Sequence, residues 1–419
     1  MLKSIINKLI NSFIKIVNYL TIKKENYIYF IPHYNCKVDK YDIINYTADN
    51  VLSLFNYIVS NNILNNYIII IEIHNYKDKD KYLSYIKSIN NRIKVIILPY
   101  GLGNRFFSKT LKIKYINNYK YFFRSKTCFI STHYNSIKFK TLNQKIICLG
   151  YYTPFKRDYH IDSKTNFNKW IDHYITTSDI SSRIISTDTN IKFNKFKAFG
   201  FPRNDYMIKN TKNKDINKYL KKKKISNYNK YIIYTPTYRD YEKNEKYSRK
   251  NILGYSNNEI KHISKLLTIN NAVLMIKLHP LQNKIIIKQD YPDNFTFIEE
   301  DENISLYDIL PITCALITDY TSLYFDYLLL NRPIIFNFYD INIYKKARGF
   351  SYDPIESICA GQIAYNFKEL YSSINNVLIQ VDNFSKDRFI LSNIMNKYNT
   401  ISSSKRIIDY FFNSNKKIL

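Results

Sequence analysis

The sequence predicts an α/β protein made of two tandem units, each with a parallel β-sheet covered by helices. Two series of apolar runs, rich in β-branched and aromatic residues, support this prediction, because each run has the length of a strand and is followed by a helical or polar stretch. A length of 419 residues with 45% hydrophobic residues is enough for two cores of ordinary size. We therefore expect two domains.

The strands of each unit are predicted from their apolar runs. In the first unit these are Tyr27–Ile31, Tyr67–Ile73, Ile93–Leu98, Thr127–Ser131 and Lys145–Leu149. In the second unit they are Tyr231–Thr235, Ala272–Leu278, Phe295–Ile298, Ala315–Thr318 and Pro333–Phe338, separated by helical segments such as Asn257–Leu267 and Ser322–Leu330. The polar, lysine-rich stretch Asn210–Asn229 lies between the two series. We expect domains over residues 23–209 and 210–400, followed by a C-terminal helix or tail over 401–419.

Residues 1–22 are predicted to form a separate amphipathic helix. Apolar residues recur at helical spacing over residues 1–20, with Lys3, Lys8 and Lys15 elsewhere on the turn. These charges argue against a membrane span, and the segment lacks the small-residue cleavage site of a signal peptide. A helix lying on anionic lipid fits this pattern. A helix docked on the protein's own core is the alternative.

The formal net charge of +29 indicates partners rich in phosphate, such as nucleotides, anionic lipids or polyanionic acceptors. Nucleic acid also fits the charge, but no RNA- or DNA-binding motif is present, so that hypothesis ranks low. The five cysteines are scattered without zinc-site spacing, which is typical of reduced thiols in the cytosol. No dinucleotide fingerprint or Walker A sequence occurs, and we expect neither a cofactor nor a metal site.

Residues that follow the strands of the second unit are candidates for anion binding, because ligands of parallel sheets bind at the carboxyl ends of the strands. Arg239 follows the first strand of this unit and offers a planar guanidinium to phosphate. Lys277 and His279 follow the second strand, where the imidazole can donate to a pyrophosphate oxygen or protonate a leaving phosphate. A purely structural histidine is the alternative.

A second group of candidates lies around the predicted helix Ser322–Leu330. Asp319, Thr321 and Ser322 follow the strand Ala315–Thr318, and the two hydroxyls are expected to cap the helix. The helix start would then be an anion site, although an ordinary cap is the simpler interpretation. Arg348 follows a later strand and loop, so that a further guanidinium could close over a ligand.

The first unit offers two segments that could line the opposite side of a cleft. One is Tyr151-Tyr-Thr-Pro-Phe-Lys156, which follows the strand Lys145–Leu149, and the other is Gly200-Phe-Pro-Arg-Asn-Asp205. They contribute Tyr151, Lys156 and Arg203 as candidate residues.

Several spaced motifs together resemble the CDP-glycerol glycerophosphotransferase family, which builds polymers of the teichoic-acid type. In chain order they are Tyr234-Thr-Pro-Thr-Tyr-Arg-Asp240, Lys277-Leu-His-Pro280, Thr318-Asp-Tyr-Thr-Ser322, Phe325-Asp-Tyr327, Arg332-Pro-Ile334 and Arg348-Gly-Phe350. The resemblance is strongest over residues 195–365 and looser before them. It implies a GT-B-like fold, with a CDP-glycerol or related donor in the second domain and a membrane-linked glycan or polyol-phosphate acceptor approaching from the first.

The resemblance also assigns roles to individual residues. Arg239, His279, Thr321 and Ser322 would hold the donor pyrophosphate, with Lys277, Asp319 and Arg348 beside it, while Lys156 and Arg203 would serve the acceptor. An acceptor hydroxyl would attack the phosphorus that bears glycerol, releasing CMP. The protein is expected in the cytoplasm, at the inner face of the cell membrane.

One position departs from the family pattern. The family usually carries His-Gly-Thr-Pro followed by a basic residue, with the histidine as base, whereas Tyr151 and Tyr152 stand here before Thr153-Pro154. Tyrosine is a weak base near neutral pH because its pKa is about 10. Either Tyr151 takes this role, helped by Lys156, or a histidine replaces it, for which His33 after the first strand is better placed than His133.

The departure leaves other functions open. A GT-B glycosyltransferase that uses a nucleotide-sugar for capsule, O-antigen or lipooligosaccharide synthesis would need the same donor site. An inactive family member that serves as a partner subunit is a further alternative.

We predict that deletion of residues 1–20 releases the protein from anionic liposomes without unfolding it, since the apolar stripe and its lysines fit interfacial binding. Liposome sedimentation measures the release, and circular dichroism measures the fold. Unchanged sedimentation would favour a helix packed on the protein core.

Overall fold

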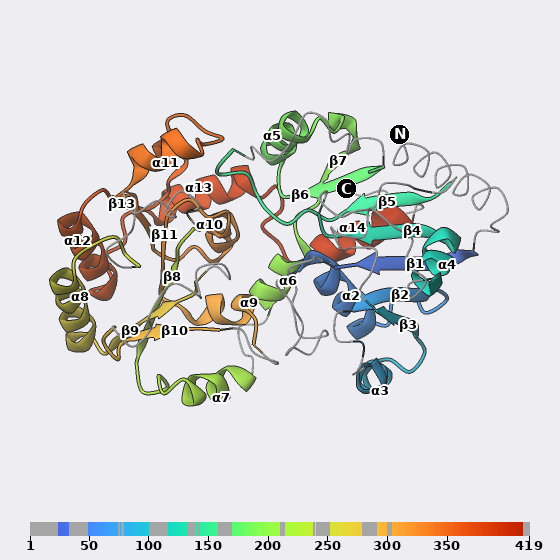
Figure 1. Ribbon diagram of the computed structural model, residues 1–419, viewed down its shortest axis with the longest axis horizontal. Coiled ribbons are helices and arrows are strands. Elements are labelled where there is room, and N and C mark those ends of the chain that lie inside the picture. The colour runs from blue at the N-terminus through green and yellow to red at the C-terminus, as the bar shows by residue number, and fades with distance from the viewer. Residues whose placement is uncertain are drawn as a thin grey trace, which may run out of the picture.

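The computed structural model describes residues 24–32, 49–73, 76, 79–99, 116–132, 140, 143–157, 170–209, 214–237, 239, 252–278, 291–299 and 304–413. These residues form two halves, each with a parallel sheet and helices on both of its faces (Figure 1). The predicted helix over residues 1–22 lies outside the described residues, as do His33 and His279.

The first half contains a seven-stranded parallel sheet in the order β3-β2-β1-β4-β5-β6-β7. Its strands are β1 (Lys24–Ile31), β2 (Ile68–Ile73), β3 (Lys94–Pro99), β4 (Ser125–Ile130), β5 (Lys145–Cys148), β6 (His173–Thr176) and β7 (Phe196–Ala198). Alternate residues of β1 serve opposite faces of the sheet. Ile28 and Phe30 join one apolar cluster, whereas Tyr29 and Ile31 join another.

Helices cover both faces of this sheet. The cluster that contains Ile28 and Phe30 also contains residues of α2 (Asn50–Ser60), α3 (Lys79–Ile89) and α14 (Ser403–Phe412). The opposite cluster is completed by α4 (Ile116–Arg124) and α5 (Asp179–Thr189). The first half is therefore a three-layer sandwich.

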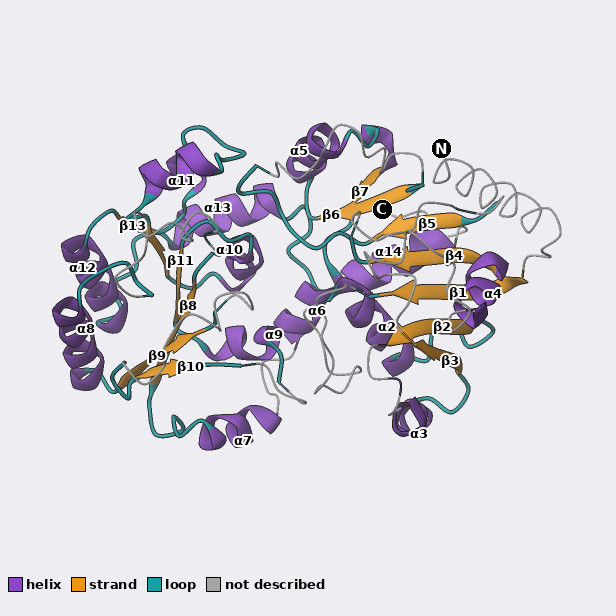
Figure 2. Cartoon of the chain, in the orientation of Figure 1, coloured by secondary structure: helices purple, strands orange, loops and turns teal. Residues whose placement is uncertain are grey.

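The second half has a six-stranded parallel sheet in the order β10-β9-β8-β11-β12-β13. Its strands are β8 (Lys230–Thr235), β9 (Ala272–Ile276), β10 (Phe295–Phe297), β11 (Ala315–Thr318), β12 (Ile334–Asn337) and β13 (Gln362–Ala364). In the central pair, β8 lies beside β11 with Thr235 opposite Thr318. Figure 2 shows the two sheets in separate halves of the molecule.

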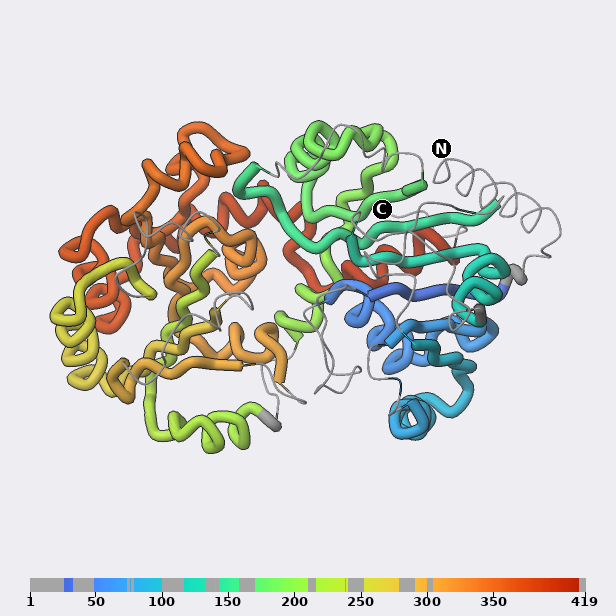
Figure 3. Tube along the Cα trace, in the orientation of Figure 1, coloured from blue at the N-terminus to red at the C-terminus, as the bar shows by residue number. Residues whose placement is uncertain are grey.

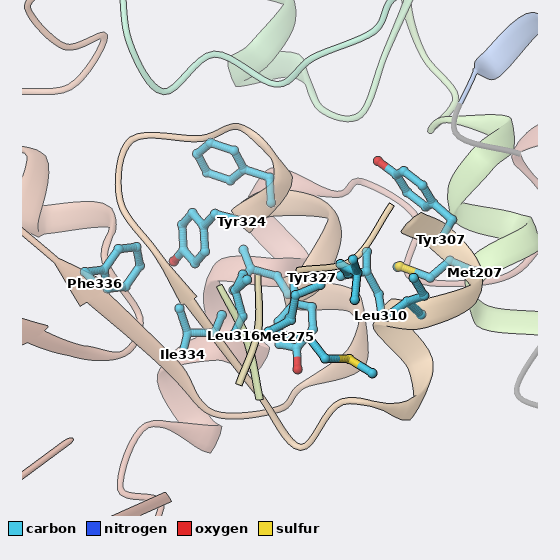
Figure 4. Packing of buried hydrophobic residues seen from close by; sticks show 14 of the residues in the cluster. Met207, Met275, Tyr307, Leu310, Leu316, Tyr324, Tyr327, Ile334 and Phe336 are labelled. Atoms are coloured by element: carbon cyan, nitrogen blue, oxygen red, sulfur yellow. The ribbon is translucent and has the colours of Figure 1, made fainter. Parts of the chain in front are cut away.

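The helices of the second half also form two layers. One layer consists of α8 (Asn257–Ile269) and α12 (Phe367–Leu378). The other includes α7 (Lys214–Lys222), α9 (Leu306–Ile309) and α10 (Leu323–Tyr327), together with the short 3-10 segments Leu310–Ile312 and Leu328–Leu330. Figure 4 shows Tyr324 and Tyr327 of α10 in one buried core with Phe336 of β12.

The described residues also form the α-helices α6 (Pro202–Lys209), α11 (Ile341–Ala347) and α13 (Ser385–Met395). Met207 of α6 packs in the core of the second half, although α6 directly follows the last strand of the first sheet.

The chain crosses between the halves a second time near its end. Helix α14 returns to the first sheet, where Ile407 and Ile408 are buried, and Figure 3 shows this red segment inside the half that holds the earliest strands. Asp205 of α6 fixes the return, because its carboxylate accepts backbone N–H bonds from Ser402, Ser403 and Ser404 at 2.7–3.1 Å.

The two-unit α/β architecture predicted from the sequence is confirmed, and all ten predicted strands are present with ends shifted by a few residues. The sequence did not reveal β6, β7 and β13, which are three or four residues long and lack a long apolar run. The predicted helix Ser322–Leu330 is shorter than expected, since regular α-helix ends at Tyr327. Within the described segments, no helix combines the length and apolarity needed to cross a membrane.

We predict that Asp205→Ala lowers the free energy of unfolding by about 1–2 kcal/mol, because three backbone donors at the start of α14 lose their acceptor. Thermal unfolding followed by circular dichroism measures the change. Lys397→Met, which removes an exposed ion pair with Asp179, is the control and should stay within about 0.5 kcal/mol of the wild type. Equal stability of Asp205→Ala and wild type would contradict the capping role.

Candidate functional site

In each sheet the strand order reverses at one place, called the switch point. A ligand of a parallel α/β sheet is expected there, beyond the carboxyl ends of the two adjacent strands. In the first half the switch point lies between β1 and β4, beside the start of α2. Here Asp49 caps the helix by accepting from the N–H groups of Val51 at 2.8 Å and Leu52 at 3.0 Å, and the Ser131 hydroxyl also donates to it. The chain's own carboxylate thus occupies this helix start, where an anion would otherwise bind.

The switch point of the second half lies between β8 and β11, and a carboxylate occupies it as well. Asp319 is fully buried and accepts from the Thr237 N–H at 2.9 Å, the Thr237 hydroxyl at 2.6 Å and the Tyr320 N–H at 2.5 Å. These bonds tie the turn after β8 to the turn after β11.

Arg239 completes this network. Its guanidinium donates to Asp319 at 2.5 Å and to both oxygens of Asp340 at 2.7 and 3.0 Å. The rings of Tyr320, Tyr339 and Tyr344 surround it. Burial lowers the pKa of Arg239, but the negative charges of Asp319 and Asp340 raise it by more than burial lowers it. The net shift of the pKa is upward, so the guanidinium stays protonated.

From its place in the sequence Arg239 is a candidate phosphate ligand, and the structure shows the partners that its donors have within the protein. The side chain is enclosed, and its donors are directed to Asp319, Asp340 and the Thr237 carbonyl. Asp319 is likewise internal, although the sequence placed it beside the donor. Both residues connect the turn after β8 to the turn after β11.

Thr321 and Ser322 lie just beyond this network and are half-buried. The Leu323 N–H donates to the Thr321 hydroxyl at 3.4 Å, while Ser322 occupies the N-cap position of α10 without a side-chain capping bond. The expected cap by both hydroxyls is therefore wrong for Ser322, whose own backbone is already helical.

A segment of the first half reaches across to this region. We call residues 151–157, which follow β5, the strap. Phe155 of the strap is buried in the core of the second half, with its ring centroid 5.7 Å from that of Tyr324 and 5.5 Å from that of Phe325. Because both rings belong to α10, the strap packs against the helix that follows Thr321 and Ser322.

Hydrogen bonds to backbone groups hold the strap to the segment after α11. Lys156 forms an isolated antiparallel bridge with Phe350, the Ser351 N–H donates to the Phe155 carbonyl at 3.1 Å, and Arg157 Nε donates to the Phe350 carbonyl at 3.2 Å. Lys156 of the predicted acceptor side is therefore brought next to the segment that carries Arg348 of the predicted donor side. Arg348 and Lys277 are both half-buried, and Lys277 directly follows β9.

The start of the strap is fixed by Arg203 in the first turn of α6. Its Nη1 donates to the Tyr151 carbonyl at 2.7 Å, and its Nη2 forms an ion pair of 2.8 Å with Asp326 of α10. Burial lowers the pKa of Arg203, but Asp326 raises it more, so the cation is retained inside the protein. Arg203 is thus enclosed between the halves, and its acceptor-side role stays a prediction.

Four residues of this junction, Asp326, Tyr307, Asn204 and Asn50, were not identified as site residues from the sequence. Asp326 accepts from the Tyr307 hydroxyl at 2.5 Å and the Asn204 amide at 3.0 Å, and Asn50 Nδ2 donates to the Gly150 carbonyl at 2.8 Å. Only the motif Phe325-Asp-Tyr327 hinted at Asp326. Among the residues that the structure describes, no three His, Cys, Asp or Glu side chains gather as metal ligands would.

Two parallel-sheet halves with opposed switch points, joined by a strap and a returning C-terminal helix, define a GT-B-like protein. A likeness in fold supports this class: a variant of the wall teichoic acid polymerase TagF matches with a TM-score of 0.69 and 20% identity, covering 99% of this chain and 95% of that one.

The model of the CDP-Glycerol:Poly(glycerophosphate) glycerophosphotransferase family matches residues 52–413, and the chain belongs to this family. The teichoic acid glycerol-phosphate primase of Bacillus subtilis (strain 168) is 31% identical over 244 residues, which are 58% of this chain and 58% of that protein. The teichoic acid ribitol-phosphate polymerase TarK of Staphylococcus aureus (strain NCTC 8325 / PS 47) is 28% identical over 158 residues, covering 37% of this chain and 29% of that protein. The chain thus spans little more than half the length of the first of these relatives.

We predict that Arg239→Met destabilises the second half by about 3–5 kcal/mol, because Asp319 and Asp340 lose the cation that compensates their buried charge. Urea unfolding measures the loss. Lys345→Met, which removes an exposed ion pair with Asp353, is the control and should cost less than about 1 kcal/mol. A stable Arg239→Met protein would show that the enclosed network is dispensable.

Proposed function

We propose that the protein transfers glycerol phosphate, or a similar polyol phosphate, from a CDP-activated donor to a membrane-linked or cell-surface glycan acceptor. The observation that carries the proposal is the strap. Its Phe155 packs on α10, the helix that follows Thr321 and Ser322, and its Lys156 bridges to Phe350, close in sequence to Arg348. Family membership supports the reaction type, and the names of the relatives include both glycerol phosphate and ribitol phosphate.

The donor is proposed to bind in the second half. Thr321 and Ser322 offer hydroxyls at a helix start, and Lys277 and Arg348 add positive charge at the carboxyl edge of the same sheet. The enclosed network of Arg239, Asp319 and Asp340 would fix the turns that carry these groups. His279, two residues after Lys277, is proposed to donate to the pyrophosphate.

The acceptor is proposed to approach from the first half. Its hydroxyl oxygen forms a new bond to the phosphorus that bears the polyol, and the bond from that phosphorus to the bridging oxygen breaks, so that CMP leaves with the electron pair. The hydroxyl proton passes to a base, for which Tyr151 and His33 are the candidates. Positioning and charge stabilisation would supply most of the catalysis.

A membrane-linked acceptor requires the enzyme to work at a lipid surface. The net charge of +29 and the amphipathic pattern of residues 1–20 support binding to an anionic membrane, and we propose that this occurs at the inner, cytoplasmic face. Neither feature is specific for one polyol.

The function is tested by CMP release from CDP-glycerol and CDP-ribitol, with UDP-sugars in parallel, each with a lipid-linked disaccharide acceptor. Acceptor-dependent release from a CDP-polyol supports the proposal. Turnover of only a UDP-sugar would favour the glycosyltransferase alternative. Binding of single-stranded RNA that weakens steeply with salt, without turnover of any donor, would favour the nucleic-acid alternative.

We predict that His279→Ala and Tyr151→Phe affect CMP release differently. Loss of the His279 donor should cost roughly 2–4 kcal/mol of transition-state stabilisation, so turnover falls by orders of magnitude. Tyr151→Phe removes only a hydroxyl and should be mild if His33 is the base. Both are measured at saturating donor and acceptor, and full CMP release by His279→Ala would return this histidine to a structural role.

A further inference from the structure

The carbonyl groups at the start of the strap are held by side chains rather than by a regular sheet. Gly150, with a φ of +67°, turns the chain out of the first sheet. Asn50 Nδ2 donates to the Gly150 carbonyl at 2.8 Å, and Arg203 Nη1 donates to the Tyr151 carbonyl at 2.7 Å. The Arg203 N–H in turn donates to Asn50 Oδ1 at 3.3 Å, so the two holding residues are linked.

The other side of Arg203 is anchored in the second half. Its Nη2 pairs with Asp326, and these side chains are only 8% and 1% exposed. Asp326 also accepts from Tyr307, Asn204 Nδ2 donates to the second oxygen of its carboxylate, and the guanidinium lies over the rings of Phe201 and Tyr307. One planar cation thus connects the Tyr151 backbone to the helix that follows Thr321 and Ser322.

We propose that Arg203 and Asp326 are positioning residues that set Tyr151 at a fixed place opposite the donor-binding turn. This inference rests on the proposed function and refines it, because it removes Arg203 from the acceptor contacts and gives it a role through the strap. A guanidinium can donate in two directions within one plane, which a lysine ammonium on a flexible stem does not reproduce. The arrangement therefore requires arginine at this position.

The test compares Arg203→Lys with Arg388→Lys. Arg388 of α13 is a matched control, because it is also buried and pairs with an aspartate. Its Nη1 and Nη2 donate to the two carboxylate oxygens of Asp382, which lies in the turn before α13. Both variants keep the charge and lose the planar fork, so both should lower the melting temperature. Arg388→Lys should retain kcat within about twofold, since no bond of Arg388 reaches the strap.

Arg203→Lys should lower kcat of acceptor-dependent CMP release by about 10- to 100-fold, because small displacements of reacting groups are costly. The affinity for CDP-glycerol, measured by calorimetry, should change by less than about twofold, since the donor turns keep their own network. Asp326→Asn should resemble Arg203→Lys, and the double variant should lose little more than either single one. The proposal is overturned if Arg203→Lys and Arg388→Lys lose the same stability and the kcat of Arg203→Lys falls no more than that of Arg388→Lys.

A second readout does not depend on the reaction. In hydrogen exchange, Arg203→Lys should speed the exchange of the amides of residues 151–157, and Arg388→Lys should leave them protected. If the wild type turns over no CDP-polyol, the proposed function fails, but faster exchange restricted to Arg203→Lys still supports the positioning role. Equal protection of the strap in both variants contradicts it.

Discussion

The arrangement of the two halves depends on the strap, a short segment of the first half whose Phe155 ring is buried in the core of the second. A buried segment outside regular structure needs a partner for each polar backbone group. Here the Phe155 carbonyl accepts from Ser351, the Arg157 N–H donates to Gly349 and the Tyr151 carbonyl accepts from Arg203. With the backbone satisfied, the Phe155 ring can add apolar contacts with α10. The two carboxyl edges are thereby held near one another by bonds that are internal to the chain.

Both switch points are occupied by a carboxylate of the chain, but with different consequences for charge. Asp49 neutralises the start of α2, and Arg203 nearby already serves Tyr151 and Asp326. In the second half, the enclosed Arg239 pairs with both Asp319 and Asp340, so this network holds one cation and two carboxylates. The nucleotide donor proposed for this half therefore depends on cations beyond the network, namely the half-buried Lys277 and Arg348.

The fold and the site were predictable from the sequence to different degrees. Strands such as Ala315–Thr318 are buried on both faces, so they stand out as continuous apolar runs. The residues that follow these strands were therefore identified, including Arg239. Its enclosure was not, because it depends on Asp340, which lies 101 residues away in the sequence. The same holds for Arg203 and Asp326, whose pairing spans 123 residues and has no local signature. Strand ends predict where a site lies, whereas burial within it is decided by tertiary contacts.

The way in which the strap is held also explains how a tyrosine can stand at position 151. Asn50 and Arg203 bind the carbonyls of Gly150 and Tyr151, which are backbone groups present with any side chain. The rest of the strap is fixed by Phe155 and by backbone bonds to Gly349, Phe350 and Ser351. None of these contacts requires a histidine at position 151. The backbone at position 151 is thus held independently of the side chain there, so the two halves can keep their arrangement with either a histidine or a tyrosine.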